Sequence, residues 1–319
     1  MIFDDPSELK DRIELLTDRK VTGQVHITQD TSEYMGIYRG MVLRLEGNDY
    51  FVTGDAREGR FGINEQPKFW VKYAIDLSTG ERKVIKLAFY EEFTTRVGRF
   101  LVKCSRSPEK ESTILDLVRE NPCFMQGRTV TDDKNNNIRV IDFIKGPTLF
   151  STIFDIPQNH ETYLFQTFPR ILESILTSIR AIGFLVREGQ HHGDIRNDHI
   201  LIQRGTSLYC WIDFDCAVNY PDYDLWSMGN ILVYAAGKGI HAVSSVMKKE
   251  AQYPTKVPRL TQDDTMVLYP YRVANLKTLY PYIPKKLNDV LLHFSYGTRR
   301  FYEDFQTLIE ELEEAISFF

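Results

Sequence analysis

The polar loop and hairpin at residues 191–213 constrain the fold of this chain more than any other stretch. The loop carries acids and bases in the order His-His-Gly-Asp-Ile-Arg-Asn-Asp-His and runs into an apolar strand predicted at residues 200–202. A turn at residues 204–207 leads to a second predicted strand at 208–212, which delivers Asp213. Two carboxylates on neighbouring strands can divide the work of phosphoryl transfer, because one orients a hydroxyl nucleophile and the other holds magnesium on the phosphates.

This pattern resembles the catalytic loop and the metal-binding motif of the protein-kinase-like superfamily. The family form is His-Arg-Asp-x-x-x-x-Asn, followed after a hairpin by Asp-Phe-Gly. By this resemblance Asp194 stands at the position of the catalytic base and Asp213 at that of the magnesium ligand. His199 stands where protein kinases have asparagine, and it is expected to be a second metal ligand. His-Gly-Asp with this later histidine is more similar to small-molecule phosphotransferases, including those that modify antibiotics.

The composition is that of a globular protein with room for two lobes. The chain has 319 residues, of which 43% are hydrophobic and 26% charged, and four scattered cysteines without metal-ligand spacing. A net charge of -5 argues against a general nucleic-acid binder. No apolar run approaches the roughly 20 residues that span a bilayer, and the first residues lack the features of a secretion signal. We therefore expect a cytoplasmic protein without membrane or nucleic-acid partners.

Residues 1–45 are expected to form an extension packed on the first lobe. Apolar residues at helical spacing predict one helix at Pro6–Thr17, and alternation predicts strands at residues 21–28 and 38–45. No function follows from these residues.

From Asp49 onward the pattern resembles the first three strands of a kinase small lobe. Strands are predicted at residues 49–53, 70–77 and 83–87, with a turn at 78–81 before the third.

A glycine-bearing segment, residues 54–62, follows the first of these strands, and several residues separate it from the next. Its end, Gly59-Arg60-Phe61-Gly62, is similar to the later half of the family's nucleotide loop, where backbone amides approach phosphates. The resemblance implies that Gly59, Phe61 and Gly62 contact ATP. Arg57 replaces the first glycine of the family, and a simple turn is the alternative interpretation.

Lys86 and Glu111 are predicted to form the ion pair that fixes the phosphates. Lys86 stands two residues after Val84, as in the family motif Val-Ala-Ile-Lys. Ser107-Pro108 begins a helix, in which Glu111 shares one face with apolar residues. The alternative is that Glu111 is a solvated charge.

The segment after the predicted strand at residues 138–143 is similar to the linker between kinase lobes. By this resemblance the backbone groups of Asp142 and Ile144 bind adenine, and Ile141 stands at the gatekeeper position.

The second lobe is predicted to be helical. Pro169 opens a helix that ends near Gly189, and two helices at residues 283–292 and 305–312 resemble the closing helices of serine/threonine protein kinases. Between them Asp224-Leu-Trp-Ser-Met-Gly matches the protein-kinase motif Asp-x-Trp-Ser-x-Gly. By resemblance, Asp224 holds the backbone of the catalytic loop.

The resemblance breaks after Asp215. Only the eight residues 216–223 stand between Asp215 and Asp224, so the long activation segment that forms a peptide platform is missing. Gly193 also replaces the arginine that would bind a phosphorylated activation loop, so we expect no such switch. Asp215, in place of glycine, is expected to touch a second metal or the substrate. Arg196 is expected to neutralise the γ-phosphate during transfer.

These observations predict an α+β protein with a bilobal protein-kinase-like fold. A small antiparallel sheet lobe with one key helix, at residues 46–145, would precede a larger, mainly helical lobe at 146–319 with a short activation segment. The expected activity is ATP- and Mg²⁺-dependent transfer of phosphate to serine or threonine hydroxyls of a protein. Two alternatives stay open: a small-molecule kinase, and a pseudokinase that binds nucleotide or a partner without turnover.

Overall fold

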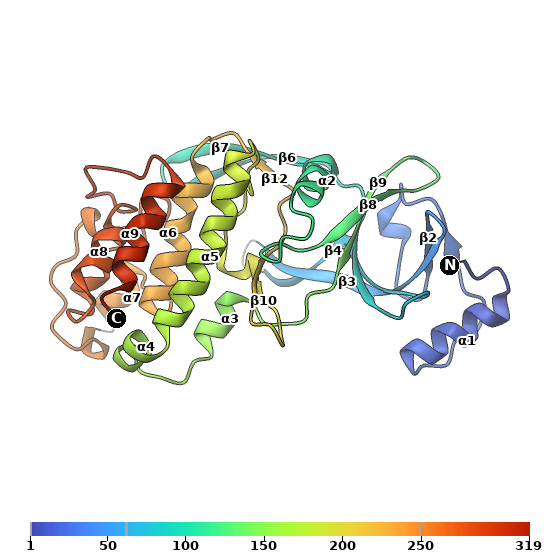
Figure 1. The fold of residues 1–319 in the computed structure, drawn as a ribbon, viewed down its shortest axis with the longest axis horizontal. Coiled ribbons are helices and arrows are strands. Elements are labelled where there is room, and N and C mark those ends of the chain that lie inside the picture. The colour runs from blue at the N-terminus through green and yellow to red at the C-terminus, as the bar shows by residue number, and fades with distance from the viewer. Residues whose placement is uncertain (1, 61–62, 249) are drawn as a thin grey trace. The chain divides into compact units, whose positions relative to one another are not determined.

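The chain is a mixed α+β protein whose residues group into two compact units (Figure 1). The structure, a computed structural model, describes residues 2–60, 63–248 and 250–319. Unit 1 comprises the chain up to Glu91, Arg106–Asn121 and Met125–Ile144, and unit 2 comprises Glu92–Ser105, Pro122–Phe124 and Lys145–Phe319. The sequence did not indicate that residues 92–105 group with unit 2.

Unit 1 is built on a sheet that contains seven strands among the described residues. Its order is β1-β2-β3-β4-β5-β9-β8, and neighbouring strands are antiparallel except for β1 with β2. The strands are β1 (Ile27–Thr28), β2 (Val42–Leu45), β3 (Asn48–Arg60), β4 (Ile63–Asp76), β5 (Arg82–Lys86), β8 (Gly127–Thr131) and β9 (Asn137–Asp142). Helices α1 (Pro6–Thr17) and α2 (Pro108–Leu117) accompany it. The apolar core of the unit includes the fully buried side chains of Leu43, Val52 and Ile85.

The glycine-bearing segment differs from the expectation. β3 continues through Gly54 to Arg60, and β4 begins at Ile63, so the spacer expected after Gly62 is wrong. Three register shifts between β3 and β4 accommodate the extra residues as bulges, which keep both strands paired. Phe61 and Gly62 themselves lie outside the described residues.

Residues of the N-terminal extension pack against strands of unit 1. Leu9 and Ile13 of α1 are buried against Val42 and Leu77. The fully buried Lys72 donates to the carbonyl of Ile37 at 2.5 Å and to Asp55 at 2.7 Å. These contacts tie both ends of the extension to the strands.

The two strands predicted in the extension are mostly wrong. Of residues 21–28 only Ile27–Thr28 is paired, and of residues 38–45 only Val42–Leu45. Val21 and Val25 pack on the cluster around α1. The alternating apolar residues in segment 21–28 therefore reflect packing against α1 more than strand pairing.

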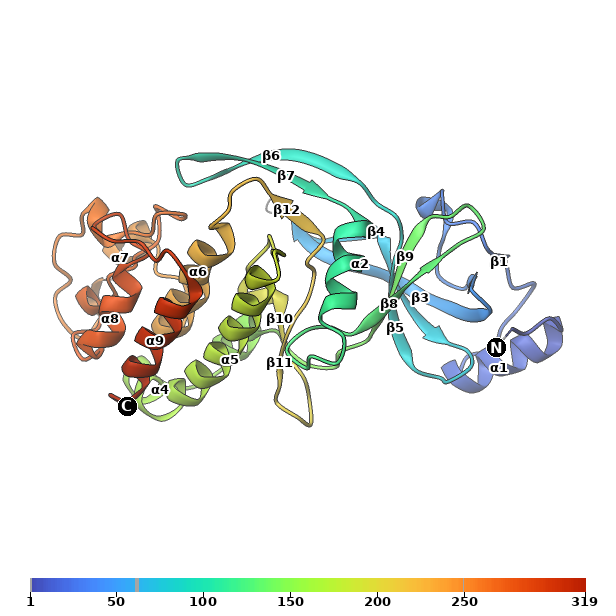
Figure 2. The same ribbon diagram turned by 45° about the horizontal axis from the view of Figure 1, so that its top comes forward.

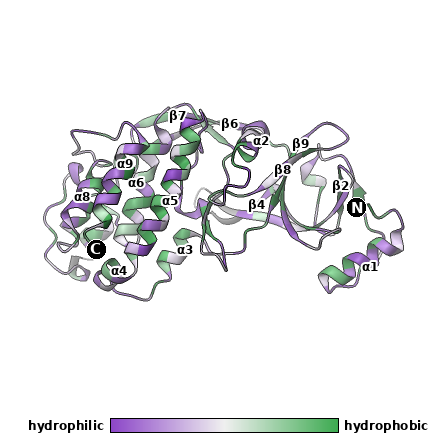
Figure 3. Cartoon of the chain, viewed as in Figure 1, coloured by the Kyte–Doolittle hydropathy of each residue, from purple (hydrophilic) through white to green (hydrophobic). Residues whose placement is uncertain are grey.

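Unit 2 is mainly helical. Its helices are α3 (Leu149–Phe154), α4 (His160–Gln166), α5 (Phe168–Arg187), α6 (Tyr223–Gly237), α7 (Val243–Lys248), α8 (Lys285–Leu292) and α9 (Phe305–Ile316). Hydrophobic residues follow α5 and α6 over most of their length (Figure 3), and α5 contacts α4, α6 and α9. The helices predicted from Pro169 and near the chain end are therefore confirmed. No helix in the described parts of the chain is both long and apolar enough to cross a membrane.

Two small sheets complete unit 2. The predicted hairpin is confirmed as β10 (Ile200–Ile202) paired with β11 (Tyr209–Trp211). A second sheet, which the sequence did not predict, has the order β12-β7-β6 and is formed by β6 (Glu91–Val97), β7 (Phe100–Arg106) and β12 (Cys216–Val218) (Figure 2). It places a hairpin against the short segment that follows Asp215.

Candidate active site

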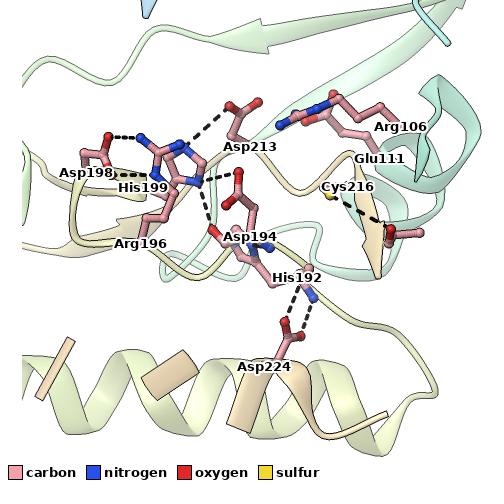
Figure 4. A network of polar contacts seen from close by, with 12 residues as sticks. Arg106, Glu111, His192, Asp194, Arg196, Asp198, His199, Asp213, Cys216 and Asp224 are labelled. Atoms are coloured by element: carbon pink, nitrogen blue, oxygen red, sulfur yellow. Dashed lines mark hydrogen bonds and ion pairs between the residues drawn. The ribbon is translucent and has the colours of Figure 1, made fainter. Parts of the chain in front are cut away.

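The predicted catalytic loop of unit 2 is held through its backbone by Asp224 of α6. The buried Asp224 carboxylate accepts hydrogen bonds from the backbone N–H of His192 at 2.6 Å and of Gly193 at 2.8 Å (Figure 4). This is the structural role that the resemblance implies for Asp224. A carboxylate that caps two adjacent amides fixes the loop without taking part in chemistry.

Gly193 has a conformation that only glycine adopts easily. Its φ is +83°, and a Cβ there would lie 1.8 Å from the carbonyl oxygen of Cys216. The strand β12 thus passes directly against the loop, which gives a physical reason for glycine in place of the family's arginine.

His199 lies between Asp194, the predicted base, and Asp213, the predicted metal ligand (Figure 4). Its Nδ1 is 2.9 Å from the backbone carbonyl oxygen of Asp194, and its Nε2 is 3.7 Å from Oδ2 of Asp213. A carbonyl oxygen can only accept, so Nδ1 carries a proton, and Nε2 faces Asp213. The structure therefore brings Asp194, His199 and Asp213 together in unit 2.

Asp213 has a strained backbone. Its φ is +66°, which is uncommon for a residue other than glycine, and its neighbour Phe214 is fully buried. Such conformations cost about 1–3 kcal/mol and cluster at functional sites. Phe214 packs edge-on against His192 and Phe124, which holds Asp213 in this conformation.

Asp213 offers the oxygen ligand that magnesium prefers, whereas the nitrogen of His199 is an unusual ligand for this ion. In the neutral form of the ring, Nε2 can bind a cation beside Oδ2 of Asp213, and the Nδ1–carbonyl bond is the second contact that metal-binding histidines make. Among the residues that the structure describes, no group of three or more His, Cys, Asp or Glu could hold a metal. Magnesium typically takes one or two protein ligands and completes its shell with phosphates and water. Asp215 is 5% exposed, and its predicted contact with metal or substrate stays a prediction.

Arg196 is bound within the loop. Its Nε and Nη2 lie 3.0 Å and 2.5 Å from the two carboxylate oxygens of Asp198. Burial raises the pKa of Asp198, but the charge of His199 and the hydrogen bond from Arg196 outweigh it, so that pKa lies below its ordinary value. The contact of Arg196 with the γ-phosphate stays a prediction.

Unit 1 contains the predicted ion pair. Nζ of Lys86 lies 2.6 Å from Oε1 of Glu111, which is fully buried on α2. Ser107 caps the helix by accepting from the N–H of Lys110 at 3.3 Å, as its position before Pro108 predicts.

A third charged residue, Arg139, belongs to this pair and was not predicted. Arg139 is 1% exposed, and its Nε lies 3.2 Å from Oε2 of Glu111. Lys86 and Arg139 are direct register partners on β5 and β9. Like charges opposite one another destabilise a sheet, so the Glu111 carboxylate between them compensates both. An arginine inside the apolar run 138–143 was the available signal.

The remaining predicted residues lie in unit 1. Gly59 is part of β3. Asp142 is the last residue of β9, and its side chain pairs with Lys83 at 2.7 Å. Ile144 follows the end of that strand, and the gatekeeper position Ile141 is buried.

The comparisons with known proteins found no relative. No protein family matches the chain, and no curated protein matches its sequence. We therefore infer the function from the residues of the site.

Proposed function

We propose that this protein is an ATP- and magnesium-dependent phosphotransferase with a bilobal protein-kinase-like fold. The observation that carries the proposal is His199, hydrogen-bonded to the backbone of Asp194 through Nδ1 and facing Asp213 through Nε2 at 3.7 Å. This arrangement supplies one carboxylate for a proton and a separate carboxylate–imidazole pair for a cation.

Each residue of unit 2 has a distinct role in this proposal. Asp194 orients the acceptor hydroxyl and takes up its proton. Asp213 and His199 would hold magnesium, which when bound neutralises charge on the phosphates. Asp224 keeps the loop in place through the N–H groups of His192 and Gly193.

Unit 1 supports the proposal through its charge. Lys86, Arg139 and Glu111 together carry one net positive charge in a buried cluster. The carboxylate fixes Lys86 by a 2.6 Å contact, so this cation would meet the phosphates of ATP with little loss of conformational freedom.

The first choice of acceptor is a serine or threonine hydroxyl of a protein. The motif from Asp224 to Gly229 lies in α6 as the protein-kinase resemblance requires, and α8 and α9 occupy the predicted closing positions in the chain.

A small-molecule acceptor is the second candidate, and one observation favours it. Residues Cys216–Val218 are paired as β12 with β7, and the Cys216 carbonyl lies against Gly193. A segment fixed in this way offers less backbone to an extended peptide than a long open activation segment does.

The test is transfer of labelled γ-phosphate from ATP with magnesium by the full chain. Wild type, Asp194→Asn and Asp213→Asn are compared with Asp222→Asn, an exposed aspartate just before α6, as the matched control. Label on generic protein acceptors or on the chain itself, lost in the first two variants alone, supports the protein kinase. Transfer only to added hydroxyl metabolites supports the second candidate. Magnesium-dependent ATP binding without transfer to any acceptor would contradict catalysis and indicate a pseudokinase.

A further inference from the structure

A cavity of about 710 Å³ in unit 1 shares no lining residue with the candidate active site. It is lined by α1, the segment after it and residues of β3 and β4, and it is open to solvent on one side. Its apolar wall includes the half-buried side chains of Leu16, Val21, Val25, Phe51 and Ile75. Pockets of roughly 300–1,000 Å³ with mainly apolar walls are typical sites for small molecules.

Three cations border this cavity: Arg19, Lys20 and Arg39. All three are exposed, and none forms an ion pair or a side-chain hydrogen bond within the described part of the chain. Their neighbour Arg12 differs, because its guanidinium donates to the carbonyl groups of Leu77 and Ser78.

The charged residues that line the cavity have one sign, although the nearby Glu14 accepts a hydrogen bond from the backbone N–H of the lining residue Val21. The lining contains no carboxylate among the described residues, although Asp and Glu outnumber Lys and Arg in the chain, 44 to 39. Three cations beside an apolar wall favour the binding of an anion. The wall favours an anion that also carries an apolar group.

We propose that this cavity binds a small organic anion with an apolar body. The apolar part would pack on Val21, Val25 and Phe51, and the anionic group would pair with Arg19, Lys20 and Arg39. Burial of the apolar part supplies most of the affinity, since exposed ion pairs contribute little, and the cations select for charge.

Two fluorescent probes with nearly the same apolar body separate these contributions. Anilinonaphthalene sulfonate carries one negative charge, and phenylnaphthylamine is its uncharged counterpart. Both are titrated into the full chain, and dodecanoate is added as a competitor. The proposal predicts one site per chain that prefers the anion and that dodecanoate empties.

The double variant Arg19→Gln/Arg39→Gln should weaken the sulfonate by about fivefold and change the uncharged probe by less than about twofold. Val25→Trp, which places a bulky ring against the apolar wall of the cavity, should weaken the binding of both probes. The control is Arg204→Gln/Arg299→Gln, which changes the same charge at two exposed arginines of unit 2.

Three results would overturn the proposal: no stoichiometric sulfonate site, unchanged sulfonate affinity in the Arg19/Arg39 variant, or an equal loss in the control. Thermal unfolding of each variant shows whether it remains folded. Displacement by an acidic peptide but not by dodecanoate would replace the small anion with a protein partner and would also overturn it.

Discussion

At the scale of single residues, two separate effects favour glycine at position 193: its backbone conformation and the close approach of a neighbouring strand. The φ of Gly193 is +83°, and a Cβ would meet the Cys216 carbonyl at 1.8 Å, whereas Gly205 has a φ of +93° and open space around it. We expect Gly205→Ala to cost about 1 kcal/mol from backbone strain alone. Gly193→Ala should cost about 2 kcal/mol more, because β12 must also move. Urea unfolding of both variants measures the difference, and equal costs would contradict the close approach.

Glu111 is the residue on which the buried charges of unit 1 depend. Glu111→Gln leaves Lys86 and Arg139 facing each other on neighbouring strands, so we expect a loss of about 3–5 kcal/mol in the free energy of unfolding. The double variant Glu111→Gln/Arg139→Met should recover part of this loss, since one of the opposed charges is gone. A cost below about 1 kcal/mol for Glu111→Gln would show that the carboxylate does not compensate these cations.

At the scale of elements, helix α4 gives unit 2 a dependence on pH. His160 stacks on Tyr280 at 3.5 Å and bonds to Tyr282 and the carbonyl of Ala236, and burial lowers its pKa to about 4. The folded state therefore binds fewer protons than the unfolded state, whose pKa is about 6.5, and stability falls as pH drops from about 6.5 to 4. The loss amounts to at most about 3 kcal/mol.

His160→Gln should flatten the stability profile in that pH window, and the exposed His26→Gln should leave it unchanged. Chemical unfolding at several pH values measures both profiles. An unchanged slope in His160→Gln would assign the acid sensitivity to other groups.

The helices and strands also show which sequence patterns were sufficient to predict structure. Helices α1 and α5 were predictable because their apolar residues recur at helical spacing, and α9 was predicted from its resemblance to a closing helix of serine/threonine protein kinases. The hairpin of β6 and β7 was not predictable from the sequence. Its strands carry exposed charged and threonine side chains, and the third strand of its sheet, β12, lies far along the chain. Local periodicity cannot report such a pairing.

At the scale of the whole molecule, the sequence predicted the separate parts of the candidate site better than their surroundings. The loop with Asp194, the hairpin to Asp213 and the Lys86–Glu111 pair follow local motifs, and the structure contains each of them. Arg139 and the contact of β12 with Gly193 depend on strands brought together by folding. The cavity beside α1 required the fold of the extension, whose strands were largely mispredicted.

Calorimetric titration of ATP into the full chain, with and without magnesium, tests the proposed metal–nucleotide site. We expect magnesium to strengthen ATP binding, and we expect Asp213→Asn to weaken magnesium-dependent binding by about tenfold or more because His199 loses its partner ligand. Asp222→Asn should bind as the wild type does. ATP affinity that is the same with and without magnesium, or that Asp213→Asn leaves unchanged, would contradict the proposed metal–nucleotide site.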